Sequence, residues 1–168
     1  SKIMGLPYPG GPLVDKYSKL GNSDAFSFSL PKVPEYNYSF SGLKTFTKTT
    51  IASIDNPSDQ DKANIALAFE TAVVDTIRIK CKRAIEHTGF KSLVIAGGVS
   101  ANKSLRLSLE KLGSDMHTKV YFPELKLCTD NGAMIAYAGL QRLKHGHTED
   151  WAISVRPRWP MTELENAQ

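Results

Sequence analysis

The stretch SLVIAGGVSAN, residues 92–102, decides the fold class of this chain. Its first five residues form a short apolar run bounded by turn residues, which is typical of a strand buried on both faces of a parallel sheet. Gly97 and Gly98 end this run, and Ser100 is placed to cap a helix that continues to about Leu112. A strand, a glycine turn and a helix in this order predict an α/β protein.

Working outward toward the amino terminus, the next element is a long amphipathic helix. Apolar residues recur every four positions over residues 59–88. Ser58 and Asp61 have the spacing of a capping box, and Gly89 is suited to the position that follows a helix. This spacing predicts one helix over 59–88.

On the carboxyl side, a second short strand is predicted at 120–123, and a helix follows it. That helix is expected to begin at Thr129 or Asp130 and to end at Gly146, with its apolar residues on an inner face. The alternation of helices and strands predicts parallel pairing. Parallel sheets normally have more than two strands, so we expect further strands of this sheet to be missing from the chain.

Residues 1–55 are less regular and rich in Gly, Pro, Ser and aromatic side chains. The run LPYPGGP at 6–12 argues against a helix or a central strand, because proline lacks the donor N–H and glycine favours turns. Short helices are predicted at 13–20 and 43–54, and an edge strand is predicted over 25–34. We divide residues 1–168 into an irregular substrate-side segment at 1–55, an α/β core at 56–146 and a basic tail at 147–168.

The composition narrows the class of protein. The chain has 168 residues, of which 41% are hydrophobic and 23% charged, and this excludes collagen-like, disordered and disulfide-scaffold proteins. No apolar run approaches the ~18–20 residues of a membrane-spanning helix. A net charge of +4 is compatible with an RNA or nucleotide partner. Cys81 and Cys128 show no metal-binding spacing and are expected to be reduced, packed thiols.

The first candidate site is the glycine turn. Gly97 and Gly98 would let a ligand approach the backbone closely, and the following helix N-terminus favours a phosphate or carboxylate. Asn102, in the first turn of that helix, would hydrogen-bond a ribose or base. The alternative is a tight strand–helix turn with a serine cap and no ligand. A glycine pair by itself leaves both interpretations open.

Three further patterns have a structural and a functional interpretation. Asp130 is either a helix cap or a carboxylate ligand for a metal or a nucleotide-bound cation. The proline-flanked glycine pair at 9–12 is either a rigid turn or a ligand contact. Ser41 and Lys44 suggest a nucleophile and a base, although a helix start with a basic residue facing ligand or RNA explains them without a His or Asp. In the tail, Arg156, Arg158 and Trp159 either contact phosphate and stack on a base or pack back on the domain.

Taken together in order, the motifs resemble a known family. They closely resemble the carboxyl-terminal half of the bacterial TsaD (Gcp/YgjD) family, the tRNA N6-adenosine threonylcarbamoyltransferases, formerly described as O-sialoglycoprotein endopeptidases. The matching motifs cover essentially the whole chain: PYPGGP (7–12), YSFSGLKT (38–45), ALAFETAVVDTIRIKCKRAIEHTG (66–89), LVIAGGVSANKSLR (93–106), CTDNGAMIAYAG (128–139) and SVRPRWP (154–160).

The resemblance implies a fold and a reaction. The family has the actin-like (ASKHA, ribonuclease H-like) ATPase fold, so this chain would be part of one lobe, with long helices on a small parallel sheet that lacks its amino-terminal strands. Members transfer threonylcarbamoyl from threonylcarbamoyl-AMP to N6 of adenosine 37 in tRNAs that read ANN codons. They are cytoplasmic and work with a paralogous TsaB-type partner and a TsaE-type ATPase.

The resemblance also implies roles for five residues. Gly11 falls on a substrate-contacting glycine, Gly97 and Gly98 on the phosphate-proximal glycines, and Asn102 on the asparagine that binds the adenylate or ATP-type nucleotide. Asp130 falls on the aspartate that completes a site for one divalent metal ion, iron or zinc.

The chain departs from the family pattern at the metal site. The HxxxH histidine pair of the family is absent from this sequence, as is its substrate-binding SGG segment. We therefore expect a carboxyl-terminal fragment that is inactive alone and that self-associates through an exposed sheet edge. The alternatives are a noncatalytic nucleotide- and tRNA-binding module and the older metalloendopeptidase assignment, which lacks an HExxH motif here.

Overall fold

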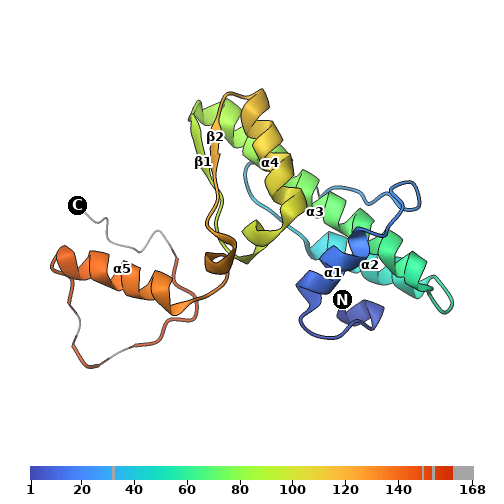
Figure 1. Ribbon diagram of the computed structural model, residues 1–168, viewed down its shortest axis with the longest axis horizontal. Helices are drawn as coiled ribbons and strands as arrows, with labels where there is room; N and C mark the ends of the chain where they lie inside the picture. Colours follow the sequence, from blue (N-terminus) through green and yellow to red (C-terminus); the bar gives the residue numbers. More distant parts are fainter. Residues whose placement is uncertain (32, 149, 153, 161–168) are drawn as a thin grey trace.

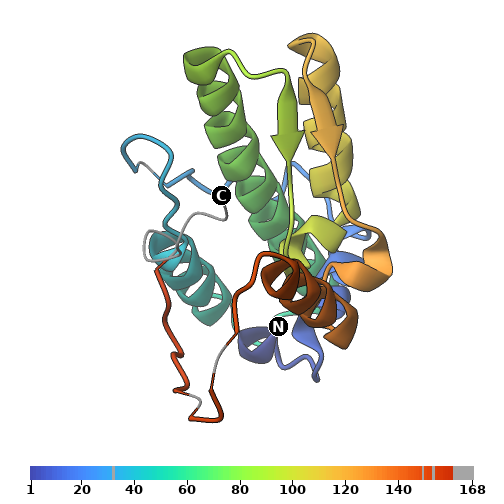
Figure 2. The same cartoon turned by 90° about the vertical axis from the view of Figure 1, so that its left-hand side faces the viewer.

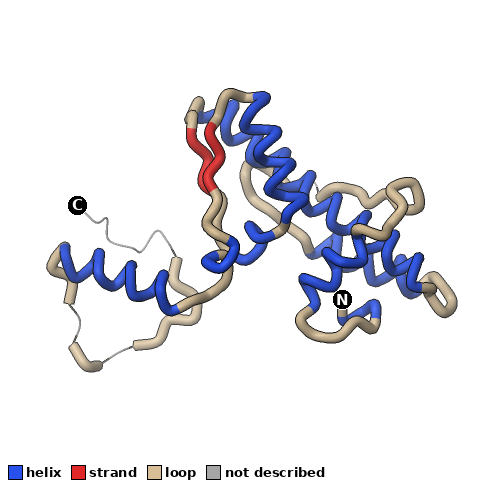
Figure 3. Tube along the Cα trace, in the orientation of Figure 1, coloured by secondary structure: helices blue, strands red, loops and turns tan. Residues whose placement is uncertain are grey.

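The structure is a computed structural model that describes residues 1–31, 33–148, 150–152 and 154–160. It is an α/β chain with long helices and a small parallel sheet, as the sequence predicts (Figures 1 and 3). The elements in chain order are the 3₁₀ helix η1 (Lys2–Met4), α1 (Gly10–Ser18), α2 (Ser41–Ala52), α3 (Asp59–Thr88), β1 (Ser92–Val94), η2 (Gly98–Ala101), α4 (Lys103–Asp115), β2 (Lys119–Tyr121), η3 (Leu125–Leu127) and α5 (Gly132–Lys144).

Helix α3 has the ends that its sequence predicts. The Ser58 hydroxyl accepts a hydrogen bond from the Asp61 amide at 3.1 Å, and the Asp61 carboxylate accepts one from the Ser58 amide at 2.9 Å. The Ser58 hydroxyl also donates to the Asp61 carboxylate at 2.5 Å, and this bond, together with the one from the Ser58 amide, holds the pKa of Asp61 below its ordinary value. Gly89 ends the helix with a φ of +68°, a left-handed conformation that favours glycine.

Two hydrophobic cores lie along α3, one on each half (Figure 1). The amino-terminal half packs with α1 and α2 around Leu43 and Ile65. The carboxyl-terminal half packs with α4 and the sheet around Leu105 and Leu109. Residues 1–55 therefore contribute helices to a packed core. This segment is more regular than its composition indicates.

The sheet is covered on one face only. β1 and β2 are parallel, with Leu93 opposite Val120, and both of these side chains pack against the core beneath α4. Side chains alternate along a strand, so Val94 and Tyr121 point to the other face, where they are 71% and 43% exposed. The prediction of a strand buried on both faces is therefore wrong for the described residues, because helices cover only one side.

Helix α4 approaches the sheet closely at Gly113. A Cβ atom at this position would lie 2.6 Å from both the Thr118 carbonyl oxygen and a Val120 methyl group. The missing side chain lets α4 pack against β2, and the helix continues to Asp115, beyond the predicted end near Leu112.

The caps of α4 and α5 differ from the predicted ones. Asn102, not Ser100, caps α4 by accepting a hydrogen bond from the Leu105 amide at 2.7 Å. Asn131, rather than Thr129 or Asp130, caps α5 in the same way. For α4, the reason is the 3₁₀ turn η2, which follows Gly97 and moves the start of the helix two residues toward the carboxyl terminus.

The amino-terminal segment also differs from its prediction. α1 begins at Gly10, with Pro12 in its first turn, where a missing N–H leaves no helical hydrogen bond unmade. The described residues of 25–34 form no strand. Phe28 is instead buried and meets the ring of Phe46 edge-to-face, with ring centroids 5.0 Å apart. Packing on a helix thus replaces the strand pairing that the alternating apolar residues indicated.

Helix α5 stands apart from the two cores in Figure 1, and in Figure 2, where this side of the molecule faces the viewer, it lies in front of them. None of its residues is buried, and Tyr137 and Leu143 of its predicted inner face are 65% and 60% exposed. Gly146 follows the helix with a φ of +78°, as expected for its end. Among the described residues, no helix combines the length and apolarity needed to cross a bilayer.

Candidate functional site

The glycine turn lies directly after β1 and is open to solvent. Gly97 has a φ of +86° and a ψ of 173°, a backbone conformation that is essentially restricted to glycine. A Cβ atom at Gly97 or Gly98 would have no neighbour within 4 Å. The buried Ser100 closes the turn by donating its hydroxyl to the Gly97 carbonyl at 2.6 Å. The turn is therefore held by a side-chain hydrogen bond and is accessible to a ligand.

Asn102 joins this turn to α3. Its side-chain oxygen caps α4, and its side-chain nitrogen donates to a Glu70 carboxylate oxygen at 2.5 Å. The Ser104 hydroxyl donates to the other Glu70 oxygen at 3.4 Å. An amide has two donor hydrogens and two acceptor lone pairs, so Asn102 retains one of each for a ligand.

Glu70 was not predicted from the sequence. It lies between Ala66 and Val74 at a spacing of four, and both of these residues are buried. A carboxylate on the apolar line of a helix needs a polar partner, and this is the signal that would have found it. Glu70 places an acceptor of hydroxyl or amine hydrogens at the edge of the glycine turn.

The loop that carries Asp130 meets the glycine turn through Cys128. The Cys128 thiol is buried. Its sulfur accepts a hydrogen bond from the Arg106 guanidinium at 3.3 Å and lies 3.3 Å from the Ser100 hydroxyl oxygen. Both cysteines are free and buried, which confirms the prediction of reduced, packed thiols. The strand order thus brings two of the predicted loops together.

The remaining predicted site residues are Asp130, Gly11 and those of the tail. Asp130 is exposed, and no cluster of three or more metal-ligating side chains occurs within the described part of the chain. Gly11 is exposed in the first turn of α1, and among the described residues no hydrogen bond or ion pair joins it to the glycine turn. In the described tail, the Arg156 guanidinium lies 5.4 Å from the centre of the Trp159 ring, which is half exposed.

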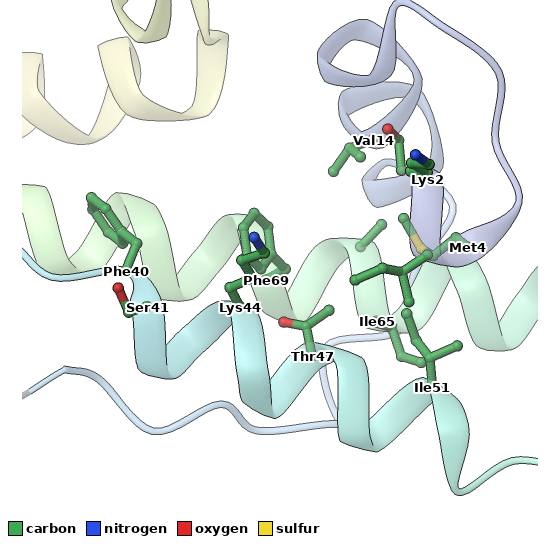
Figure 4. A pocket seen from close by; sticks show the side chains of 13 residues that line it. Lys2, Met4, Val14, Phe40, Ser41, Lys44, Thr47, Ile51, Ile65 and Phe69 are labelled. Atoms are coloured by element: carbon green, nitrogen blue, oxygen red, sulfur yellow. The ribbon is translucent and has the colours of Figure 1, made fainter.

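A cavity of 730 Å³ lies between η1, α1, α2 and α3, apart from the glycine turn (Figure 4). Ser41 and Lys44 line it from α2, and the rest of its wall is largely apolar. No His or Asp lines the cavity, so these two residues have no partner there that would make them a nucleophile and its base. The thirteen lining residues are Ser1, Lys2, Ile3, Met4, Val14, Phe40, Ser41, Lys44, Thr47, Ile51, Ile65, Ala66 and Phe69.

Comparison with known families identifies the chain. The model of the TsaD family, tRNA N6-adenosine threonylcarbamoyltransferase, matches residues 1–137. The chain belongs to the TsaD family. The matched region contains Gly11, the glycine turn and Asp130, and it ends within α5. Membership in this family supports a threonylcarbamoyltransferase-type function in tRNA modification.

Proposed function

We propose that this TsaD-family chain holds the adenylate in the transfer of threonylcarbamoyl from threonylcarbamoyl-AMP to N6 of adenosine 37 in tRNAs reading ANN codons. The observation that carries this proposal is the open glycine turn at 97–98 with the Asn102–Glu70 pair beside it. An accessible backbone followed by a 13-residue helix suits a phosphate group. The Glu70 carboxylate suits the hydroxyl groups of a ribose.

In this reaction the adenosine amine attacks the carbamoyl carbon. A bond forms between N6 and that carbon, the bond from the carbon to the phosphate oxygen breaks and its electron pair stays on the phosphate, N6 releases one proton to water, and AMP leaves. The contribution of this chain is to bind the adenylate and to stabilise the charge on the leaving phosphate through the backbone of η2 and the amino end of α4.

The metal site is incomplete in the described residues. Asp130 supplies one exposed carboxylate, and no second and third ligand lie with it in the described ranges. These residues do not by themselves fit an iron or zinc ion, which takes four or more ligands. We propose that Asp130 would supply one carboxylate ligand of a divalent metal site whose other ligands lie outside the described residues.

Replacing Asn102 by alanine tests the adenylate site. We expect affinity for AMP, measured by isothermal titration, to fall about tenfold, because the variant loses the cap of α4 and the contact that orients Glu70. The matched control is Asn131→Ala, which removes the corresponding cap from α5. Equal affinities in both variants, or binding by neither variant nor the wild type, would contradict the proposal.

A transfer assay separates the enzyme from the noncatalytic alternative. We expect the chain alone to bind AMP but to leave tRNA unmodified when given threonylcarbamoyl-AMP, because one carboxylate does not make a metal site. Full transfer by the chain alone would show that the site is complete.

In the cell we propose a cytoplasmic enzyme acting with a TsaB-type partner and a TsaE-type ATPase.

The uncovered surfaces support a further proposal, that the chain associates with itself through the sheet. The only sheet in the described residues has two strands, so β1 and β2 each present an edge. Val94 and Tyr121 add an open apolar face. We expect the mass from light scattering to rise with protein concentration, and a constant monomer mass would refute this.

A further inference from the structure

We propose that Arg106 is a positioning residue. It holds the glycine turn, residues 97–102, and the Asp130 loop, residues 123–131, in a fixed arrangement relative to each other. The effect of Arg106 on adenylate binding rests on the proposed function, whereas its role in holding the two loops together does not. Arg106 lies one turn into α4, between the two loops, and its side chain is only partly exposed.

A single guanidinium group reaches both loops. Its Nε donates to the Ser100 carbonyl at 2.6 Å, which belongs to the glycine turn. Its Nη2 donates to the Pro123 carbonyl at 2.7 Å and to the Cys128 sulfur at 3.3 Å, both on the Asp130 side. The group also lies 4.8 Å from the centre of the Phe122 ring, which is a cation–π contact.

Side chains alone make this connection. Among the described residues, no hydrogen bond between backbone groups joins 97–102 to 123–131. Besides Arg106, the contact between described residues consists of the Ser100 hydroxyl oxygen and the Cys128 sulfur, which lie 3.3 Å apart, while the thiol hydrogen faces the Glu124 carbonyl at 3.4 Å. Removing the guanidinium therefore leaves only the contact of Ser100 with Cys128 between the described residues of the two loops.

The chemistry explains why this residue is an arginine. Its donors form a planar fork that serves acceptors in two directions while the plane lies against an aromatic ring. A lysine has a compact ammonium that satisfies fewer of these acceptors at once. We therefore expect Arg106→Lys to restore only part of the connection that Arg106→Met removes.

The two cysteines provide a direct test. Cys128 contacts the Arg106 guanidinium, whereas Cys81 lies on α3 in the core beneath α4. Peptide-resolved labelling with a thiol reagent therefore reports separately on the two loops, through Cys128, and on the whole fold, through Cys81. We expect Arg106→Met to accelerate labelling of Cys128 by about tenfold while leaving Cys81 unchanged, with Arg106→Lys in between. The matched control is Arg78→Met, which removes a surface ion pair with Asp75.

Unchanged labelling of Cys128 in Arg106→Met would overturn the proposal. So would equal acceleration at both cysteines, since that reports general unfolding. A parallel titration with AMP should show affinity reduced about fivefold in Arg106→Met, and partial recovery in Arg106→Lys. If the wild type binds no AMP, the proposed function fails, but the labelling result still decides the role of Arg106.

Discussion

Replacing Leu109 by alanine is expected to lower the free energy of unfolding by about 3 kcal/mol. Leu109 has an exposed fraction of 0% and lies in the core formed by α4, the carboxyl half of α3 and the sheet. The substitution removes buried methyl groups and leaves a cavity, because helices on one side and strands on the other cannot both move inward. Urea unfolding followed by circular dichroism measures the loss.

The control for Leu109 lies on the same helix. Leu107 is 66% exposed, so Leu107→Ala should change the free energy of unfolding by less than about 0.5 kcal/mol. Equal destabilisation by the two substitutions would show that the core beneath α4 is not packed as described.

Replacing Lys80 by alanine is expected to cost about 3 kcal/mol. Lys80 is 5% exposed, and its ammonium donates to the backbone carbonyls of Val33, Pro34 and Glu35, the last at 2.7 Å. These charge-assisted hydrogen bonds attach the segment before α2 to the carboxyl-terminal half of α3. The variant should also show faster amide hydrogen exchange just after these carbonyls, over residues 34–38.

Lys82 provides the comparison for Lys80. Its side chain is 52% exposed and pairs with Glu86 at 3.7 Å on the surface of the same helix. Surface pairs contribute little, so Lys82→Ala should cost less than about 0.5 kcal/mol. A small effect of Lys80→Ala, matched by that of Lys82→Ala, would contradict the assigned role of the buried ammonium.

Several features were predictable because local rules decide them. The capping box of Ser58 and Asp61 and the glycine after Thr88 defined α3 to the residue. The glycine pair after a short apolar run located the turn at 97–98. The motifs identified the family, and the match over residues 1–137 confirms it.

The candidate site was predictable only in part. Its glycines and Asn102 stand in a recognisable motif, whereas Glu70 lies 32 positions from Asn102 and reaches it only when α3 packs on α4. The role of Arg106 was hidden for the same reason, since its acceptors belong to loops on two different strands. Periodicity describes which face of a helix is buried, but not which polar atoms meet across it.

The sequence by itself determined most of the helices, the glycine turn and the family, because each depends on residues a few positions apart or on a motif. The parallel pairing followed from the order of helices and strands along the chain. Tertiary structure alone decided the Asn102–Glu70 pair, the connection through Arg106 and Cys128, and the buried ammonium of Lys80. It also decided that Val94 faces solvent, since strand burial depends on how many layers cover the sheet. These contacts join distant parts of the chain, and their partners are chosen by packing, which no local pattern records.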